Sequence, residues 1–278
     1  MIRSHPRAIV VIGMHRSGTS AVARGLAALG VYLGDDFLAA QPENPTGYWE
    51  DRRIVELNER VLATLRLRWD GARPIDLREF AGWQMWRLRR EAIRDLRRRF
   101  LPHPIWGFKD PRTIRLLPFW RRVLGEAGAD DAYLLVIRNP ASIAASLHVR
   151  QGTDAETAQR LWLINMVPFL HEVADRPLVV VDYDALMRDP REQLERIAQR
   201  LQLPRADDAE IDRFANEFLN AGLRHTVFSL SDIDARTEAG RLTRTAFFSL
   251  AELANDRSVP DASFWQTWRD IASRLRSG

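Results

Sequence analysis

Two glycines, two serines, a threonine and an arginine lie within eight residues near the start of the chain, in the order Gly-Met-His-Arg-Ser-Gly-Thr-Ser. This segment, residues 13–20, follows the apolar run 8–12 and precedes a helix-forming stretch. The first amides of a helix have no intrahelical acceptor and carry partial positive charge, so a phosphate placed there meets several donors. The segment therefore predicts an anion-binding loop whose ligands are Arg16, Ser17, Gly18, Thr19 and Ser20.

The glycine spacing of this loop matches the Gly-x-x-x-x-Gly of a P-loop, but Thr19 stands where a nucleoside triphosphatase carries its lysine. Without that lysine the loop is poorly equipped for β- and γ-phosphates held with magnesium. A cation inside the loop, Arg16, suits a single terminal phosphate instead. A small-molecule kinase should also show Gly-Lys-Ser or Gly-Lys-Thr and a magnesium-holding acid after another strand, and it is kept as an alternative.

A second polar motif, Arg138-Asn139-Pro140, follows the apolar run 133–137, and Ser146 comes eight residues after Arg138. Asn139 can cap a helix that Pro140 opens, which places Ser146 about two turns along that helix. Ligands of open parallel sheets bind beyond the carboxyl ends of the strands, and both polar motifs follow predicted strands. We therefore expect the two motifs to share one binding site.

The chain has 41 lysine and arginine residues, and Lys109 is the only lysine. It lies in Gly-Phe-Lys-Asp-Pro-Arg, at the end of a strand predicted for 105–108. Lysine is a compact, movable point charge and arginine a broad planar fork, so a cation that must follow an oxygen during bond cleavage resists replacement by arginine. The alternative is that this lysine remained by chance.

These motifs resemble those of sulfotransferases that use 3′-phosphoadenosine 5′-phosphosulfate (PAPS), in a bacterial branch with Gly-Tyr-Trp-Glu and Lys-Asp-Pro-Arg signatures. Residues 13–20 are similar to the 5′-phosphosulfate loop of the family, and Arg138 with Ser146 is similar to its 3′-phosphate motif. The segment 179–190 is like the strand and helix that close the fold in many members. The resemblance spans residues 8–203 and implies an α/β, P-loop-like three-layer fold, with a central parallel sheet flanked by helices.

The reaction that the resemblance implies is in-line transfer of a sulfuryl group from PAPS to an acceptor oxygen or, less commonly, nitrogen, with PAP as the leaving group. Arg16 and Lys109 would neutralise charge on the leaving 5′-phosphate, while Arg138 and Ser146 would hold the 3′-phosphate. The favoured acceptor is a hydroxyl of a carbohydrate or small metabolite. A non-catalytic nucleotide- or glycan-binding module would keep the phosphate loops but lose the reactive cation.

An acceptor hydroxyl has a pKa far above 7 and needs a base. The passage 44–51, Asn-Pro-Thr-Gly-Tyr-Trp-Glu-Asp, places two carboxylates after a turn and after two aromatic residues able to floor an acceptor pocket. Glu50 is the expected base, and its alternative role is to begin the helix predicted from Arg52. Asp51, Asp110 and His15 compete with it for the catalytic role.

Two parts of the sequence leave the resemblance incomplete. Cytosolic small-molecule sulfotransferases usually place a tryptophan directly after the loop to stack on adenine, whereas this chain has Ala21. The adenine contacts therefore stay unassigned. Further along, Leu223-Arg224-His225 is similar to a short motif of the bacterial branch, although a histidine after a helix is more often structural.

Composition favours one globular enzyme domain covering residues 1–278, in the cytoplasm. The chain has no cysteine and six scattered histidines, so neither a disulfide framework nor a zinc site is expected, and no apolar run reaches membrane-span length. Arginines crowd residues 84–100 at amphipathic spacing, which predicts a helix with a solvated basic face. Attraction of a polyanionic acceptor or an anionic membrane surface is the alternative for that face, and nucleic acid is not expected as a partner.

The elements that must position these groups alternate as a parallel sheet requires. Continuous apolar runs predict buried strands. Helices are predicted where apolar residues recur at helical spacing or a capping residue precedes proline, and Pro168 should divide a long helical pattern. The predicted strands are 8–12, 105–108, 133–137 and 178–181, and the predicted helices include 19–29, 52–67, 84–100, 190–201 and a final amphipathic helix containing Trp265 and Trp268.

Overall fold

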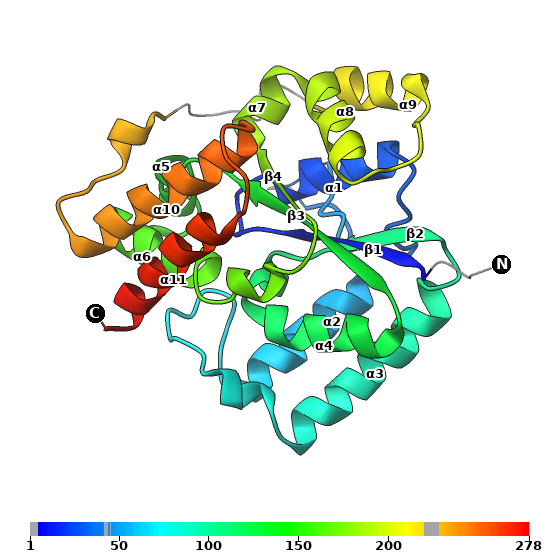
Figure 1. Cartoon of the computed structure of the whole chain (residues 1–278), viewed down its shortest axis with the longest axis horizontal. Helices are drawn as coiled ribbons and strands as arrows, with labels where there is room; N and C mark the ends of the chain where they lie inside the picture. The colour runs from blue at the N-terminus through cyan, green and yellow to red at the C-terminus, as the bar shows by residue number, and fades with distance from the viewer. Residues whose placement is uncertain (1–4, 42–43, 45, 220–227, 278) are drawn as a thin grey trace.

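A computed structural model of the chain describes residues 5–41, 44, 46–219 and 228–277. Within these residues, four strands form one parallel sheet in the order β2-β1-β3-β4 (Figure 1). The fold is therefore α/β with a central parallel sheet, as predicted. The strands are β1 (Arg7–Ile12), β2 (Ile105–Lys109), β3 (Asp130–Ile137) and β4 (Leu178–Asp182).

Both faces of the sheet are buried, because the residues of each strand alternate between two hydrophobic cores. In β1, Ala8, Val10 and Ile12 belong to one core, whereas the two residues between them belong to the other. Helices cover both faces, so a continuous apolar run is what these strands require. This is the physical basis on which the strands could be predicted from the sequence.

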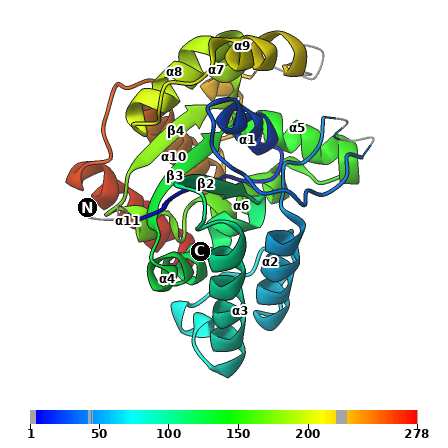
Figure 2. The same cartoon turned by 90° about the vertical axis from the view of Figure 1, so that its right-hand side faces the viewer.

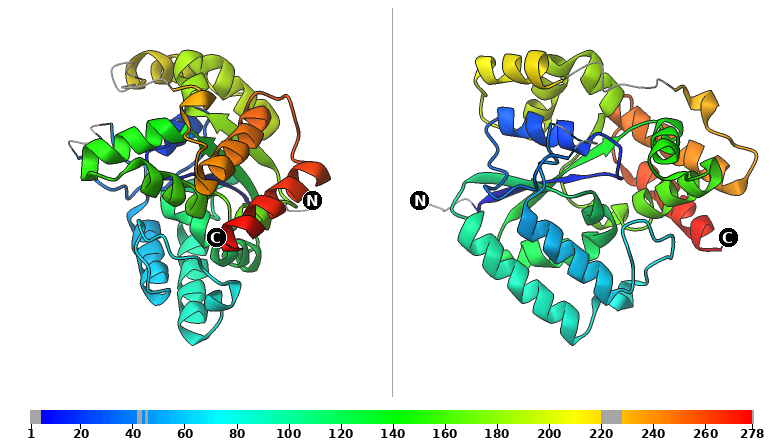
Figure 3. Two further views of the ribbon diagram at one scale, coloured as in Figure 1. Left: turned by 90° about the vertical axis from the view of Figure 1, so that its left-hand side faces the viewer. Right: turned by 180° about the vertical axis from the view of Figure 1, so that it is seen from behind.

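Helices lie on either side of the sheet, with α1, α7, α8 and α9 on one side and α2, α3 and α4 on the other (Figures 1 and 2). The helices α5, α6, α10 and α11 gather at one end of the molecule, where α10 also contacts β4 (Figure 3). Their bounds are α1 (Thr19–Ala28), α2 (Arg52–Thr64), α3 (Trp83–Arg99), α4 (Leu117–Ala127), α5 (Pro140–Gln151), α6 (Ala155–Met166), α7 (Tyr183–Arg188), α8 (Pro190–Arg200), α9 (Asp208–Arg213), α10 (Glu238–Ala254) and α11 (Ala262–Ser277).

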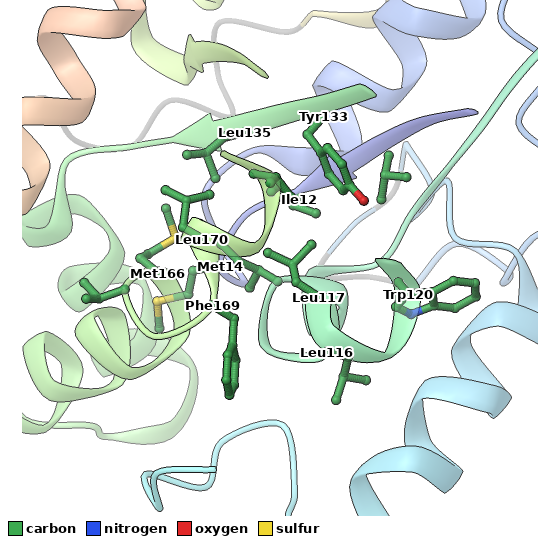
Figure 4. Close-up of a cluster of buried hydrophobic side chains, with 14 of the residues drawn as sticks. Ile12, Met14, Leu116, Leu117, Trp120, Tyr133, Leu135, Met166, Phe169 and Leu170 are labelled. Carbon is green, nitrogen blue, oxygen red and sulfur yellow. The ribbon is translucent and has the colours of Figure 1, made fainter. Parts of the chain in front are cut away.

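The larger core anchors the end of β1 from which the anion-binding loop departs. Ile12 and Met14 pack there among side chains of β3, α4 and the segment after α6 (Figure 4). Met14 is 2% exposed, so the first residues of the loop are fixed by hydrophobic packing on the side away from solvent. The loop is thus held rigidly at its start.

Most predicted elements are confirmed, with shifts of a few residues. The predicted helix 52–67 ends at Thr64, because Arg66 adopts a positive φ of 56° that no helix continues through. Pro168 does divide its helical pattern, since α6 ends at Met166. Trp265 and Trp268 are buried, and none of the described helices is long and apolar enough to span a membrane.

Candidate active site

The anion-binding loop joins β1 to α1 through two glycines in conformations that favour glycine. Gly13 has φ +153° and Gly18 has φ +91°. A Cβ atom at Gly18 would come within 2.1 Å of the ring of Tyr183, the first residue of α7, so no other residue fits there. Inside the loop, Ser17 donates from Oγ to the carbonyl of Met14 at 2.7 Å. The backbone is therefore folded into a tight turn ahead of α1.

The N-terminus of α1 has no side-chain cap among the described residues and no acid in its first turn. In contrast, each of the helices α2, α5 and α8 is preceded by an aspartate or asparagine whose side chain accepts a hydrogen bond from an amide of the first helical turn. Because the first amides of a helix lack intrahelical acceptors, the amides of Thr19 and Ser20 are available to an anion. This local structure is what the loop prediction required.

Arg16 connects the loop to the second polar motif. Its Nε donates to Ser146 Oγ at 2.9 Å, and its carbonyl accepts a 3.4 Å hydrogen bond from Arg138 Nη1. Asn139 caps α5 by accepting from the amide of Ala141, as predicted. The structure thus brings Arg16, Arg138 and Ser146 together. Arg16 was predicted to bind the 5′-phosphate, but its guanidinium contacts Ser146, which was predicted to bind the 3′-phosphate.

Beside this cluster, two buried side chains each have a polar atom without a hydrogen-bond partner among the described residues. Arg138 is 8% exposed, stacks over the ring of Tyr183, and has an Nε atom with no partner among the described residues. Ser142, in the first turn of α5, is 1% exposed, and its Oγ is also unpartnered. Ser142 was not among the residues predicted from the sequence, although its position one helical turn before Ser146 places the two hydroxyls on one face of α5.

Lys109 lies at the end of β2 and donates to three oxygens. Its Nζ lies 3.2 Å from Ser20 Oγ, 3.0 Å from the carbonyl of Tyr48 and 2.5 Å from Glu50 Oε1. Parallel pairing of β1 with β2 sets this position, because Val11 is the register partner of Lys109. The lone lysine therefore connects the anion-binding loop to the carboxylate predicted as the base.

Glu50 is 5% exposed and forms its salt bridge with Lys109 inside the protein. Burial raises the pKa of Glu50, while Lys109 acts in the opposite direction. Arg112 Nη1 lies 3.6 Å from the second carboxylate oxygen of Glu50. Arg112 was likewise not predicted as a site residue, although it belongs to the same Lys-Asp-Pro-Arg motif as Lys109.

The two aspartates that compete with Glu50 have structural partners. Asp51 caps α2 by accepting from the amide of Ile54, and it also forms a salt bridge with Arg99. It is Asp51, rather than Glu50, that begins the predicted helix.

Asp110 has comparable partners. It accepts hydrogen bonds from the amide of Arg112, from the Arg112 side chain and from Asn58 Nδ2, each at 2.9 Å. Its carboxylate is fully buried among these donors.

His15 remains the other candidate base. Its ring lies 4.5 Å from that of Trp69, and its Nε2 is buried with no partner among the described residues. Burial holds the pKa of His15 well below its ordinary value, and the nearby charges of Arg112, Lys109, Arg150 and Arg16 lower it further. The imidazole is therefore neutral at neutral pH.

Near Glu50, Trp49 packs against Phe37 and Phe218, and Arg24 lies 5.3 Å from its ring. Whether Tyr48 and Trp49 floor an acceptor pocket stays a prediction. The predictions that fall on Pro45 and on the segment 223–225 lie outside the described residues. Among the described residues, no group of three or more histidine, aspartate or glutamate side chains could hold a metal ion.

The chain belongs to the sulfotransferase family. A sequence profile described as "Sulfotransferase family" matches residues 6–208, which contain the anion-binding loop, Glu50, Lys109, Arg138 and Ser146. No curated protein matches the chain. The predicted membership of the sulfotransferase family is thus confirmed, and the chain is a transferase by this membership.

Solved structures similar to this one include three sulfotransferases. The sulfotransferase domain of the Synechococcus PCC 7002 olefin synthase is 15% identical, with a TM-score of 0.48. The match covers 89% of this chain and 97% of that one. The sulfotransferase domain from the curacin biosynthetic pathway is 15% identical with a TM-score of 0.46, covering 98% of both chains. Sulfotransferase STF1 from Mycobacterium tuberculosis H37Rv is 16% identical, with a TM-score of 0.46. The match covers 87% of this chain and 77% of that one.

Proposed function

We propose that the protein transfers the sulfuryl group of PAPS to an acceptor hydroxyl of a carbohydrate or small metabolite and releases PAP. The observation that carries this proposal is the position of Lys109, whose ammonium lies between Ser20 of the anion-binding loop and Glu50. The ammonium of Lys109 thus contacts both Ser20, which is expected to bind the donor phosphate, and Glu50, which is expected to face the acceptor. One domain over residues 1–278 is part of the same proposal.

The residues present fit a nucleotide with two separate anionic groups. The uncapped N-terminus of α1 supplies amides for one of them. Arg138 Nε and Ser142 Oγ are buried donors without acceptors, and such groups destabilise a protein unless a ligand or water satisfies them. They lie beside Ser146 and Arg16, so the second anion, the 3′-phosphate, is assigned to this cluster.

PAPS supplies an activated sulfuryl group with PAP as its leaving group, and the residues of this chain supply charge and position. Lys109, with the loop hydroxyls and amides, neutralises negative charge at the 5′-phosphate. Arg16 contributes from between the two anion sites, since its side chain contacts Ser146 while its backbone belongs to the loop. Arg138, Ser142 and Ser146 hold the 3′ end.

Glu50 is assigned as the base that takes the acceptor proton on a carboxylate oxygen. Burial raises the pKa of this carboxyl, which makes the carboxylate a stronger base than an exposed glutamate. Asp51 and Asp110 are less suited because both oxygens of each carboxylate already accept hydrogen bonds. In Glu50, Lys109 bonds only Oε1, and Arg112 lies 3.6 Å from Oε2. His15 is the second candidate, favoured by its unpartnered Nε2.

PAP is expected to stabilise the protein without any metal, because the loop offers amides and hydroxyls but no triphosphate lysine. At a hundred times its dissociation constant, PAP should add about 2.7 kcal/mol to the free energy of unfolding. Thermal-shift measurements with PAP, ATP and GTP, each with and without magnesium, test this. A strong shift by magnesium-ATP and none by PAP would favour a kinase and reject the proposal.

Replacement of Arg138 by alanine should weaken PAP binding much more than binding of 5′-AMP, which lacks the 3′-phosphate. Loss of a hydrogen bond to a charged group costs about 1.5 to 3 kcal/mol, or roughly tenfold or more in affinity. Calorimetric titration of both ligands gives the two affinities. Ser142→Ala should show a smaller selective loss, and an equal loss of both ligands in Arg138→Ala would assign Arg138 to another part of the nucleotide.

A further inference from the structure

A row of side chains on one face of α3 combines exposed indole rings with arginines. Trp83, Arg87, Arg90 and Arg94 recur every three or four residues, so they share a face that extends about 16 Å along the helix. The helices α2 and α3 pack side by side at the edge of the molecule away from α1 (Figures 2 and 3). The face is thus continuous and lies outside the candidate active site.

This face borders a groove of about 660 Å³ between α2 and α3, here called the α2–α3 groove. Ala63 and Thr64 at the end of α2 form part of the opposite wall, together with Arg60. Alanine and threonine are short, so the groove is open where the tryptophans lie. The surface is concave here, so a planar bilayer would reach only the rims of the groove.

The charges in the α2–α3 groove are not neutralised in the way that other charges of α3 are. Arg87, Arg90 and Arg94 form no salt bridge among the described residues, and the lining carboxylate Glu91 is held by Arg60 through two hydrogen bonds of 2.5 and 2.8 Å. Three of the four arginines of α3 outside the groove have carboxylate partners, in the pairs Arg89–Glu126, Arg98–Asp95 and Arg99–Asp51. The fourth, Arg97, donates to the backbone carbonyl of Glu126. A merely solvated basic face does not account for this contrast.

Two tryptophans form a platform at the end of the groove. Trp83 is 67% exposed and Trp86 is 42% exposed, and their rings stack with centroids 4.7 Å apart and planes 17° apart. Because the two rings stack on each other, they offer one platform rather than a series of them. A single strand of nucleic acid is bound on successive stacking rings, which the arginine row lacks.

We propose that the α2–α3 groove binds an acidic oligosaccharide, with one sugar ring against Trp83 and carboxylate or sulfate groups on Arg87, Arg90 and Arg94. The arginines lie about one helical turn apart, so a linear chain with an anionic group on successive rings meets them in order. This binding needs no PAPS and no sulfuryl transfer. Failure of this binding proposal would therefore leave the proposed sulfuryl transfer untouched, and failure of the transfer would leave the binding proposal untouched.

The test is calorimetric titration of the full chain with a uronate-containing sulfated hexasaccharide, its neutral desulfated and carboxyl-reduced counterpart, phosphatidylserine vesicles and single-stranded DNA. The acidic hexasaccharide should bind and the neutral one should not. Arg87→Gln with Arg90→Gln should weaken binding by about tenfold or more. Trp83→Ala should weaken it by about threefold to tenfold.

Matched controls lie on other helices. Arg122 on α4 and Arg244 on α10 are exposed and form no salt bridge among the described residues, and Phe248 is 50% exposed. Arg122→Gln with Arg244→Gln, and Phe248→Ala, should leave hexasaccharide affinity unchanged. Equal losses in these controls, equal binding of the neutral oligosaccharide, or tighter binding of vesicles or DNA through the same residues would overturn the proposal.

Discussion

Replacement of Lys109 by alanine is expected to lower turnover by about a hundredfold to a thousandfold, the usual cost of losing a preorganised charge-stabilising donor. The Lys109 side chain is 2% exposed and its ammonium contacts both Ser20 and Glu50, so water cannot readily replace it. Affinity for PAP should change by only a modest factor, because Arg138 and the loop amides remain. Single-turnover rates per PAP-binding site give the measurement.

Two variants separate chemistry from folding in this experiment. Lys109→Ala leaves the buried Glu50 without its partner, and breaking a buried salt bridge costs about 3 to 5 kcal/mol of stability, so rates must be compared below the melting temperature. Lys109→Arg keeps the charge, yet a planar guanidinium cannot occupy the place of an ammonium bonded to three differently placed oxygens. Turnover of Lys109→Arg should therefore stay low. Full activity in this variant would contradict the expectation and show that the reaction does not require a lysine at position 109.

Replacement of Glu50 by glutamine should lower turnover by roughly a hundredfold or more, because it keeps the shape of the side chain and removes the base. Only the carboxylate can accept the proton, so wild-type activity should decline as pH falls through the pKa of Glu50, which burial raises. In Glu50→Gln this acid limb should disappear from the residual rate. Affinity for PAP should stay near that of the wild type.

Asp51→Asn is the matched control for Glu50→Gln, since it changes the adjacent carboxylate. Asp51 caps α2 and pairs with Arg99, so its loss should lower the melting temperature more than it lowers turnover. Wild-type turnover in Glu50→Gln would contradict the assignment and move the base to His15. In that case His15→Gln should show the loss of turnover that was expected for Glu50→Gln.

The loop and the second motif could be predicted from the sequence because their signals are local. A strand that ends just before Gly13, an uncapped helix start at Thr19 and an Asn139-Pro140 cap are set by residues that are neighbours in the chain. The parallel sheet follows from apolar runs that both cores require. From these elements alone, the carboxyl end of the sheet was the expected position of the site.

Contacts between distant segments could not be predicted in the same way. The salt bridge between Lys109 and Glu50 joins residues 59 positions apart, and the hydrogen bond between Arg16 and Ser146 joins residues 130 apart. Sequence patterns indicate which face of an element is buried but not which polar groups meet across it. The end of α2 was misplaced for a related reason, because the apolar pattern continues through Leu65 while the positive φ of Arg66 ends the helix.

Transfer of radiolabelled sulfur from PAPS into a pool of carbohydrates and small metabolites is the most direct test of whether the protein is a PAPS-dependent sulfotransferase. We expect acceptor-dependent release of PAP, without added metal, at a rate that falls by about a hundredfold or more in Lys109→Ala and in Glu50→Gln. Label that stays in PAPS with every acceptor, although PAP binds at the site, would contradict it and indicate a binding module. Label transfer at the wild-type rate in both variants would contradict the assigned roles of Lys109 and Glu50.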